Sequence, residues 1–262
     1  MEPLKKPLVL DKSFIQGSNA AQLDELAGEY TFYIPSAFYF ELFNNQPDAR
    51  SRTISGLKYF HRIDVYTSLK EEREQGKPVN SINSNIKVFN PLVRDKQWRV
   101  REKESRVLAN YNNKIVNPLV DIFIALINNK ITLGFSSEEL AALSGSEKDF
   151  STLCGELIKK ERIQRIAEMA SIQHASFIDS SWLHFCLVQA WALQVLVLKK
   201  YYPDPRQCLG RKRMKHEILD MEYLILGLHC GSLATKETSQ KKPFLSMAWK
   251  FKTLSENGVL FT

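Results

Sequence analysis

Two short apolar runs near the start of the chain enclose a helical stretch. Residues 7–11 are apolar up to a final Asp11, and residues 30–35 are rich in β-branched and aromatic side chains. Both compositions are typical of strands. Residues 19–29 between them have a helical composition, with leucines three positions apart and a glycine near the end. This order predicts a β-α-β unit with parallel strands and a right-handed crossover.

The same alternation continues after this unit and returns near the C-terminus. It predicts a helix over residues 36–43 with Ser36 as its N-cap, a helix over 51–61, a strand over 63–66, a helix over 212–228, and strands over 232–235 and 258–261. The first and last parts of the chain therefore share one α/β pattern.

The middle of the chain is helical instead. After a polar stretch with Gly and Pro at 75–85, which predicts a loop, helices are predicted over 95–110, 118–128, 136–143 with Ser136 as cap, 149–171 and 180–201. We therefore predict an α/β core formed by residues 1–68 and 206–262, which carries a helical insertion over residues 69–205.

One apolar stretch, residues 181–198, is nearly long enough to cross a bilayer. His184, Gln189 and Gln194 interrupt it, and such side chains need internal partners in hydrocarbon. This favours a buried helix of a soluble protein. The first seven residues lack the apolar core of a signal peptide, and we expect a cytoplasmic protein that does not bind membranes.

The composition of the chain indicates a class of binding partner but does not distinguish between folds. The chain is 44% hydrophobic and 25% charged, which is ordinary for a globular protein. Its net charge of +7 favours a polyanionic partner, nucleic acid first and an acidic membrane surface second. The four cysteines form no C-x-x-C pair, and no histidine has a second ligand at zinc-like spacing. This disfavours a structural zinc and indicates reduced thiols.

Four acids fall where the predicted core would bring them together. Asp11 ends the first strand, Glu41 lies in the helix after the second, Asp220 lies in the C-terminal helix, and Glu237 follows the strand after that helix. In open parallel sheets, ligands bind beyond the carboxyl ends of the strands. Crowded carboxylates repel one another, and a divalent cation removes that cost. Their hard oxygen ligands suit Mg²⁺ or Mn²⁺, and a metal-activated water could then attack a phosphodiester.

Four segments around these acids resemble the motifs of the PIN-domain ribonuclease family, and they occur in that family's order. Residues 8–15 (LVLDKSFI) resemble its opening, an acid that closes the first strand with Ser or Thr two places on. Residues 34–42 (IPSAFYFEL) resemble its second motif, a strand that ends in Pro before a helix with a Glu. Residues 220–227 (DMEYLILG) and 231–237 (GSLATKE) resemble its third and fourth motifs.

The resemblance implies a PIN-like three-layer α/β/α fold with a central, mostly parallel sheet, to which this chain adds a large helical insertion. It implies that the acids hold one or two Mg²⁺ or Mn²⁺ ions and hydrolyse phosphodiester bonds, with RNA favoured over DNA. The implied catalytic and metal-binding residues are Asp11, Glu41, Asp220 and Glu237. Ser13 and Thr235 would be supporting hydroxyls that orient carboxylates or metal-bound water.

Two features depart from the family's pattern. The last acid is Glu237 where Asp is usual, and the insertion is much longer than in small PIN toxins. Two further acids, Glu217 and Glu222, lie near Asp220 and could substitute in the site, although Glu222 should point to another face of its helix.

A basic cluster precedes Asp220, and its members Arg211, Arg213 and Lys215 are the predicted substrate-binding residues. Such side chains could hold the phosphates that flank the cleaved one. A solvated helix end is the alternative interpretation of this cluster.

Two other functions stay open at this stage. A PIN-like protein whose site has decayed would bind nucleic acid or act as a scaffold without metal dependence. A phosphatase on a similar sheet would need a second Asp two places after the first, and position 13 is Ser, which argues against it. The insertion could bind a partner protein, cover the site or form a homodimer.

Overall fold

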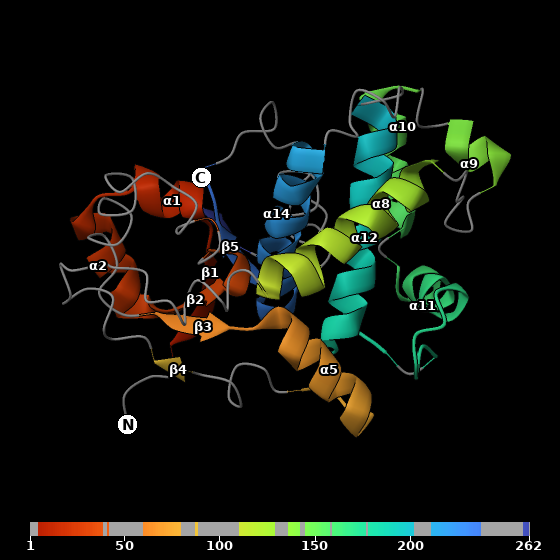
Figure 1. Cartoon of the computed structure of the whole chain (residues 1–262). Coiled ribbons are helices and arrows are strands. Elements are labelled where there is room, and N and C mark those ends of the chain that lie inside the picture. The colour runs from red at the N-terminus through yellow and green to blue at the C-terminus, as the bar shows by residue number, and fades with distance from the viewer. Residues whose placement is uncertain are drawn as a thin grey trace.

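More residues lie in helices than in strands in the described part of the chain, whose arrangement is shown in Figure 1. The structure is a computed structural model and describes residues 5–38, 41, 60–79, 87–88, 110–128, 136–141, 145–157, 159–176, 178–201, 211–236 and 259–261. Most of the helices predicted over 51–61 and 95–110, and most of the loop predicted over 75–85, lie outside these residues. The predicted end of the first helix is wrong, because His61 begins a strand.

The described strands form one sheet of six, in the order β4-β3-β2-β1-β5-β6. They are β1 (Lys6–Leu10), β2 (Tyr30–Pro35), β3 (His61–Ile63), β4 (Lys87–Val88), β5 (Ser232–Ala234) and β6 (Val259–Phe261). Every neighbouring pair is parallel except β3 and β4. The predicted mixed α/β fold with a mostly parallel sheet is confirmed at this level.

Strand β1 is the centre of the sheet. Its residue Val9 lies opposite Tyr33 of β2 on one side and opposite Leu233 of β5 on the other. Leu8, Val9 and Leu10 are all fully buried. Since successive side chains of a strand point to opposite faces, both faces of the sheet are covered here. Helix α2 (Ala20–Glu29) joins β1 to β2, as the predicted β-α-β unit requires.

The third strand lies earlier than the sequence predicts. The prediction over 63–66 is wrong because α5 (Val65–Gln75) already begins at Val65. Asp64 ends the strand, since its carboxylate accepts a hydrogen bond from the Thr67 N–H at 3.0 Å and so caps the helix. The β-branched and aromatic residues after Asp64 belong to the first turn of this helix. Their composition is typical of a strand, which explains the wrong prediction.

The helix after β2 begins at Ser36, where the sequence predicts it, but Ser36 is not its N-cap. Ser36, the predicted N-cap, is itself helical. The N–H of Ala37 donates instead to Glu222 Oε2 of a distant helix, at 2.9 Å. A buried carboxylate thus takes the place of the expected hydroxyl cap.

The middle of the chain is mainly helical where the structure describes it. Its helices are η1 (Asn112–Val116), a π-helical turn, followed by α8 (Asn117–Asn128), α9 (Ser137–Ala141), α10 (Glu147–Leu157), α11 (Lys160–Met169) and α12 (Leu183–Tyr201). Ser136 caps α9 as expected: its Oγ accepts from the Glu139 N–H at 3.1 Å, and its own N–H donates to Glu139 Oε2 at 2.8 Å.

The single helix predicted over 149–171 is wrong, because the chain forms α10 and α11 there. Leu157 is the last buried apolar residue of α10, and Ile163 is the first of α11. Residues six apart on one helix point about 120° away from each other. The break at Lys159, whose backbone is extended (φ −63°, ψ 141°), returns Ile163 to the core side.

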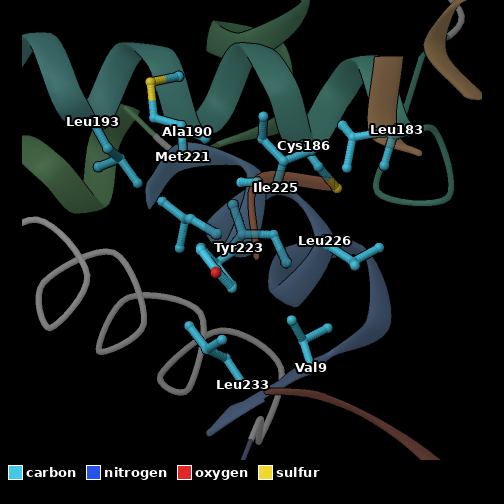
Figure 2. Packing of buried hydrophobic residues seen from close by; sticks show 14 of the residues in the cluster. Val9, Leu183, Cys186, Ala190, Leu193, Met221, Tyr223, Ile225, Leu226 and Leu233 are labelled. Carbon is cyan, nitrogen blue, oxygen red and sulfur yellow. The ribbon is translucent and has the colours of Figure 1, made fainter. Parts of the chain in front are cut away.

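Two long helices join the helical middle to the sheet. Helix α14 (Arg211–Cys230) contacts β1, β2 and β5 and also contacts α12. Figure 2 shows α12 lying over α14, with Leu183 and Cys186 above Ile225, and with Val9 and Leu233 of the strands on the far side of α14. The two parts of the chain therefore share one continuous core.

Helix α12 is long and apolar enough to cross a membrane by length and composition, but 67% of the window Leu183–Lys200 is buried inside the protein. This burial is the pattern of a core helix. Gln194, one of its polar residues, is fully buried and donates to Glu217 Oε2 of α14 at 2.8 Å.

Candidate functional site

The carboxyl ends of β1 and β5 meet at the point where the strand order reverses. From β1 the chain continues through β2 to β3 on one side, whereas β5 is followed by β6 on the other. Open α/β sheets bind ligands at such switch points, beyond the carboxyl ends of the strands. Asp11 directly follows β1, and Thr235 directly follows β5.

Asp11 is held there by two hydroxyls. Its side chain is 5% exposed. Oδ2 accepts from Ser13 Oγ at 2.5 Å and from Thr235 Oγ1 at 2.8 Å, and the two hydroxyl oxygens are 3.2 Å apart. The Lys236 N–H donates to Ser13 Oγ at 3.0 Å. The supporting role predicted for Ser13 and Thr235 thus has a geometric counterpart, since both hydroxyls orient the Asp11 carboxylate.

Glu41 enters the same region from the helix after β2. Its Oε2 accepts from the Tyr223 hydroxyl of α14 at 2.8 Å, and its Oε1 lies 3.4 Å from Lys12 Nζ. Lys12 is the first residue of the short helix α1 (Lys12–Gly17). The Glu41 carboxylate is therefore joined both to the C-terminal helix and to the residue next to Asp11.

Asp220 approaches from α14, where it lies one turn before Tyr223 and is 5% exposed. Burial raises the pKa of the Tyr223 hydroxyl well above 10, and the charges of Glu41, Asp11 and Asp220 raise it further. Of the four predicted acids, Glu41 is hydrogen-bonded to this hydroxyl, and the charges of Asp11 and Asp220 also act on it. The raised pKa also keeps this hydroxyl protonated, as a hydrogen-bond donor to Glu41.

The remaining predicted residues are placed only in part. Glu237 lies outside the described residues, one position after Lys236. Arg211 and Arg213 lie in the first turn of α14, but their side chains are outside the description. Lys215 is half-buried and lies five positions before Asp220, about 140° around the helix, so the two side chains leave α14 in different directions.

The two alternative acids point elsewhere. Glu222 is fully buried and accepts hydrogen bonds from the Ala37 N–H and from the Tyr111 hydroxyl; it lies two positions after Asp220, about 160° around the helix. Glu217 accepts from Gln194 of α12. Both acids hold helices together.

Tyr223 and Lys12 belong to the site although the sequence analysis did not select them. The position of Tyr223 three residues after Asp220 was a usable signal, because residues three apart share a helix face. Lys12 had no such signal, since its contact with Glu41 depends on how β1 and β2 pair.

The donor set determines which ion fits. The four predicted acids carry carboxylates, the hard oxygen donors that suit Mg²⁺ or Mn²⁺, and two of them, Asp11 and Asp220, are each only 5% exposed. In the described ranges, however, no three Asp, Glu, His or Cys side chains already converge as metal ligands. The carboxylates therefore match a divalent cation in donor chemistry, and a complete ligand set would require side-chain adjustment or Glu237.

Three of the four cysteines lie in the described part of the chain. Cys154, Cys186 and Cys230 are free thiols there. Burial raises the pKa of Cys230 to about 12.

Comparisons with protein-family models, with curated proteins and with solved structures gave no match to this chain.

Proposed function

We propose that this protein is a nuclease that depends on Mg²⁺ or Mn²⁺ and hydrolyses phosphodiester bonds, with RNA as the favoured substrate. One observation carries the proposal: Asp11 is fixed by Ser13 and Thr235 at the switch point of a parallel sheet, and its charge acts, with those of Glu41 and Asp220, on the Tyr223 hydroxyl that donates to Glu41.

The fold supports the PIN-like interpretation of the four motifs. Helix α14 contacts the sheet and carries Asp220, while the helix after β2 carries Glu41. Figure 1 shows α2 and α14 on either side of β1 and β2. A three-layer α/β/α core, extended by the helices between α5 and α14, is the arrangement that we propose. The domain division at 1–68, 69–205 and 206–262 belongs to the same hypothesis.

The chain's own residues have distinct parts in this proposal. Asp11, Glu41, Asp220 and Glu237 would hold the metal. When bound, such an ion supplies Lewis acidity: it lowers the pKa of a coordinated water and offsets the phosphate charge. Ser13 and Thr235 fix the Asp11 carboxylate plane, and Tyr223 fixes that of Glu41. Because these side chains are already fixed before the metal binds, binding loses less side-chain entropy.

Substrate binding relies on the protein's positive charge. A net charge of +7 favours polyanions, and we assign Arg211, Arg213 and Lys215 to the phosphates that flank the cleaved bond. We also propose that the helical middle binds a partner protein or forms a homodimer. The protein would be cytoplasmic and would not bind membranes.

A second candidate is a nucleic-acid-binding or scaffold protein with a decayed site. It is favoured by the Lys12–Glu41 ion pair, which places a positive charge on a predicted metal ligand, and by the Glu in place of Asp at 237.

The two candidates differ in metal-dependent cleavage. Purified protein is incubated with labelled single-stranded RNA and DNA in Mn²⁺, in Mg²⁺ and in EDTA. The D11N and D220N variants should lose cleavage by about 100-fold or more while they keep the wild-type circular dichroism spectrum. The matched control is Asp24→Asn on the exposed side of α2, which should cleave like the wild type.

Cleavage that survives in EDTA, or equally in D11N, contradicts the nuclease proposal. If folded wild type binds RNA in EDTA but cuts nothing in either metal, the decayed-site candidate replaces it.

A further inference from the structure

A lysine ammonium lies against one of the proposed metal ligands. Lys12 Nζ is 3.4 Å from Glu41 Oε1, and the two side chains are only 21% and 12% exposed. Lys12 follows Asp11 directly in the chain. The ammonium is therefore held beside the acidic residues and is not a freely solvated surface charge.

The other oxygen of Glu41 already has a partner, because Oε2 accepts from the Tyr223 hydroxyl. A divalent cation that binds Glu41 through Oε1 would meet the ammonium at the same oxygen. Two cations that share one partly buried carboxylate repel each other. One of them must leave, and only the lysine is attached to a flexible chain.

A displaced ammonium next to the site has one obvious new partner. Lysine binds phosphate as a compact point charge, and a phosphodiester drawn to the metal would bring its own negative charge to the mouth of the site. The metal and the phosphate would then each favour the binding of the other, as thermodynamic linkage requires.

We infer that Lys12 is an exchangeable counter-ion, which pairs with Glu41 in the metal-free site and transfers to the substrate phosphate when Mg²⁺ or Mn²⁺ displaces it. This inference rests on the proposed function, since it assumes that Glu41 is a metal ligand. It gives Lys12 a binding role that the four-acid motifs do not include.

The test measures two affinities of the full-length protein without any cleavage. Calorimetry gives the Mn²⁺ affinity of wild type, K12M and K12R. A second titration gives the affinity for adenosine monophosphate in Mn²⁺; this probe carries a phosphate but no phosphodiester bond. In K12M, Mn²⁺ should bind about fivefold more tightly, in line with the loss of one partly exposed ion pair, and the nucleotide about fivefold more weakly. K12R should behave like wild type in both titrations.

Two lysine variants serve as controls. Lys70 forms an exposed ion pair with Glu74 on α5, so K70M removes the same kind of pair far from the site. Lys236 lies near the site, but its Nζ donates to the Gly17 carbonyl, so K236M removes a nearby charge without freeing Glu41. Neither should raise the Mn²⁺ affinity as K12M does.

The possible results distinguish a failure of the lysine exchange from a failure of the proposed metal-dependent function. If wild type binds Mn²⁺ but K12M binds it no more tightly, or if K12M weakens both ligands together as a merely structural lysine would, the exchange is wrong and the metal site stands. If neither wild type nor K12M binds Mn²⁺, the proposed metal-dependent function is wrong, and the inference fails with it.

Discussion

Tyr223 is the residue through which the C-terminal helix reaches the acids of the N-terminal segment. It is fully buried, and its hydroxyl donates to Glu41 while Asp11 and Asp220 act on the same hydroxyl. A buried carboxylate that loses such a donor keeps its desolvation cost without compensation. The orientation of Glu41 therefore depends on a side chain that carries no charge.

This dependence predicts a specific coupling between two positions. Y223F removes the donor to Glu41 and should lower the free energy of unfolding by about 1–3 kcal/mol. In the E41Q background the same change should cost about 1 kcal/mol less, because the charged acceptor is already gone. Urea unfolding of the four proteins gives the coupling energy. Strictly additive effects would show that Tyr223 does not act on Glu41.

The residue scale also shows what the sequence could and could not predict about the site. Asp11 was recognisable because an acid that ends an apolar strand lies at the sheet edge, and Asp220 because it lies on the apolar face of α14. Lys12 could not be selected, since its distance to Glu41 depends on the pairing of β1 with β2 and no local pattern encodes it. Glu237 stays a prediction.

At the scale of elements, the start of α12 is fixed by a glutamate from another helix. Glu72 of α5 is fully buried, and its carboxylate accepts from the N–H groups of Leu183 and His184, each at 2.8 Å. It also lies 2.6 Å from His184 Nδ1. These N–H groups have no partner within their own helix, and a negative charge at this end is favourable to the helix dipole.

Replacing this carboxylate by an amide should therefore destabilise the protein. E72Q turns one acceptor into an NH₂ group that faces N–H donors, and we expect a loss of about 2–3 kcal/mol in the free energy of unfolding. E74Q on the exposed face of the same helix should change it by less than about 0.5 kcal/mol. Equal urea midpoints for E72Q and E74Q would contradict the capping role.

Element types were easier to predict than element ends. The strands over 30–35 and 232–235 and the long α12 and α14 follow from composition and periodicity alone. The start of α5 did not, because Asp64 can cap a helix or follow a strand, and only the Thr67 contact decides. The break between α10 and α11 was detectable, since the apolar spacing changes phase after Leu157.

At the scale of the whole molecule, two partly buried tyrosines join the helical middle to the sheet side. Tyr111, next to η1, donates to Glu222 of α14, and Tyr66 of α5 lies beside it. Both residues are partly exposed. Burial raises the pKa of each hydroxyl well above 10, and the charge of Glu222 raises it further.

This arrangement predicts a loss of stability at alkaline pH. Tyr66, Tyr111 and Tyr223 keep their protons when folded, whereas in the unfolded chain they ionise near pH 10. Stability is therefore complete below pH 10 and falls above it, by about 1.4 kcal/mol per pH unit for each tyrosine. Urea unfolding between pH 9 and about 11, read beside the tyrosinate absorbance, measures this. Ionisation of all nine tyrosines near pH 10 in the still-folded protein would contradict it.

The proposed function requires a divalent cation to bind near Tyr223, on whose hydroxyl the charges of Asp11 and Asp220 act. A crystal of the full-length protein soaked in Mn²⁺ tests it most directly through the anomalous signal of the metal. We expect a peak about 2 Å from a carboxylate oxygen of Asp11 and of Asp220, and no such peak in D11N. A saturating soak with no peak at this sheet edge, or with a peak only elsewhere, would contradict the metal site and the nuclease function built on it.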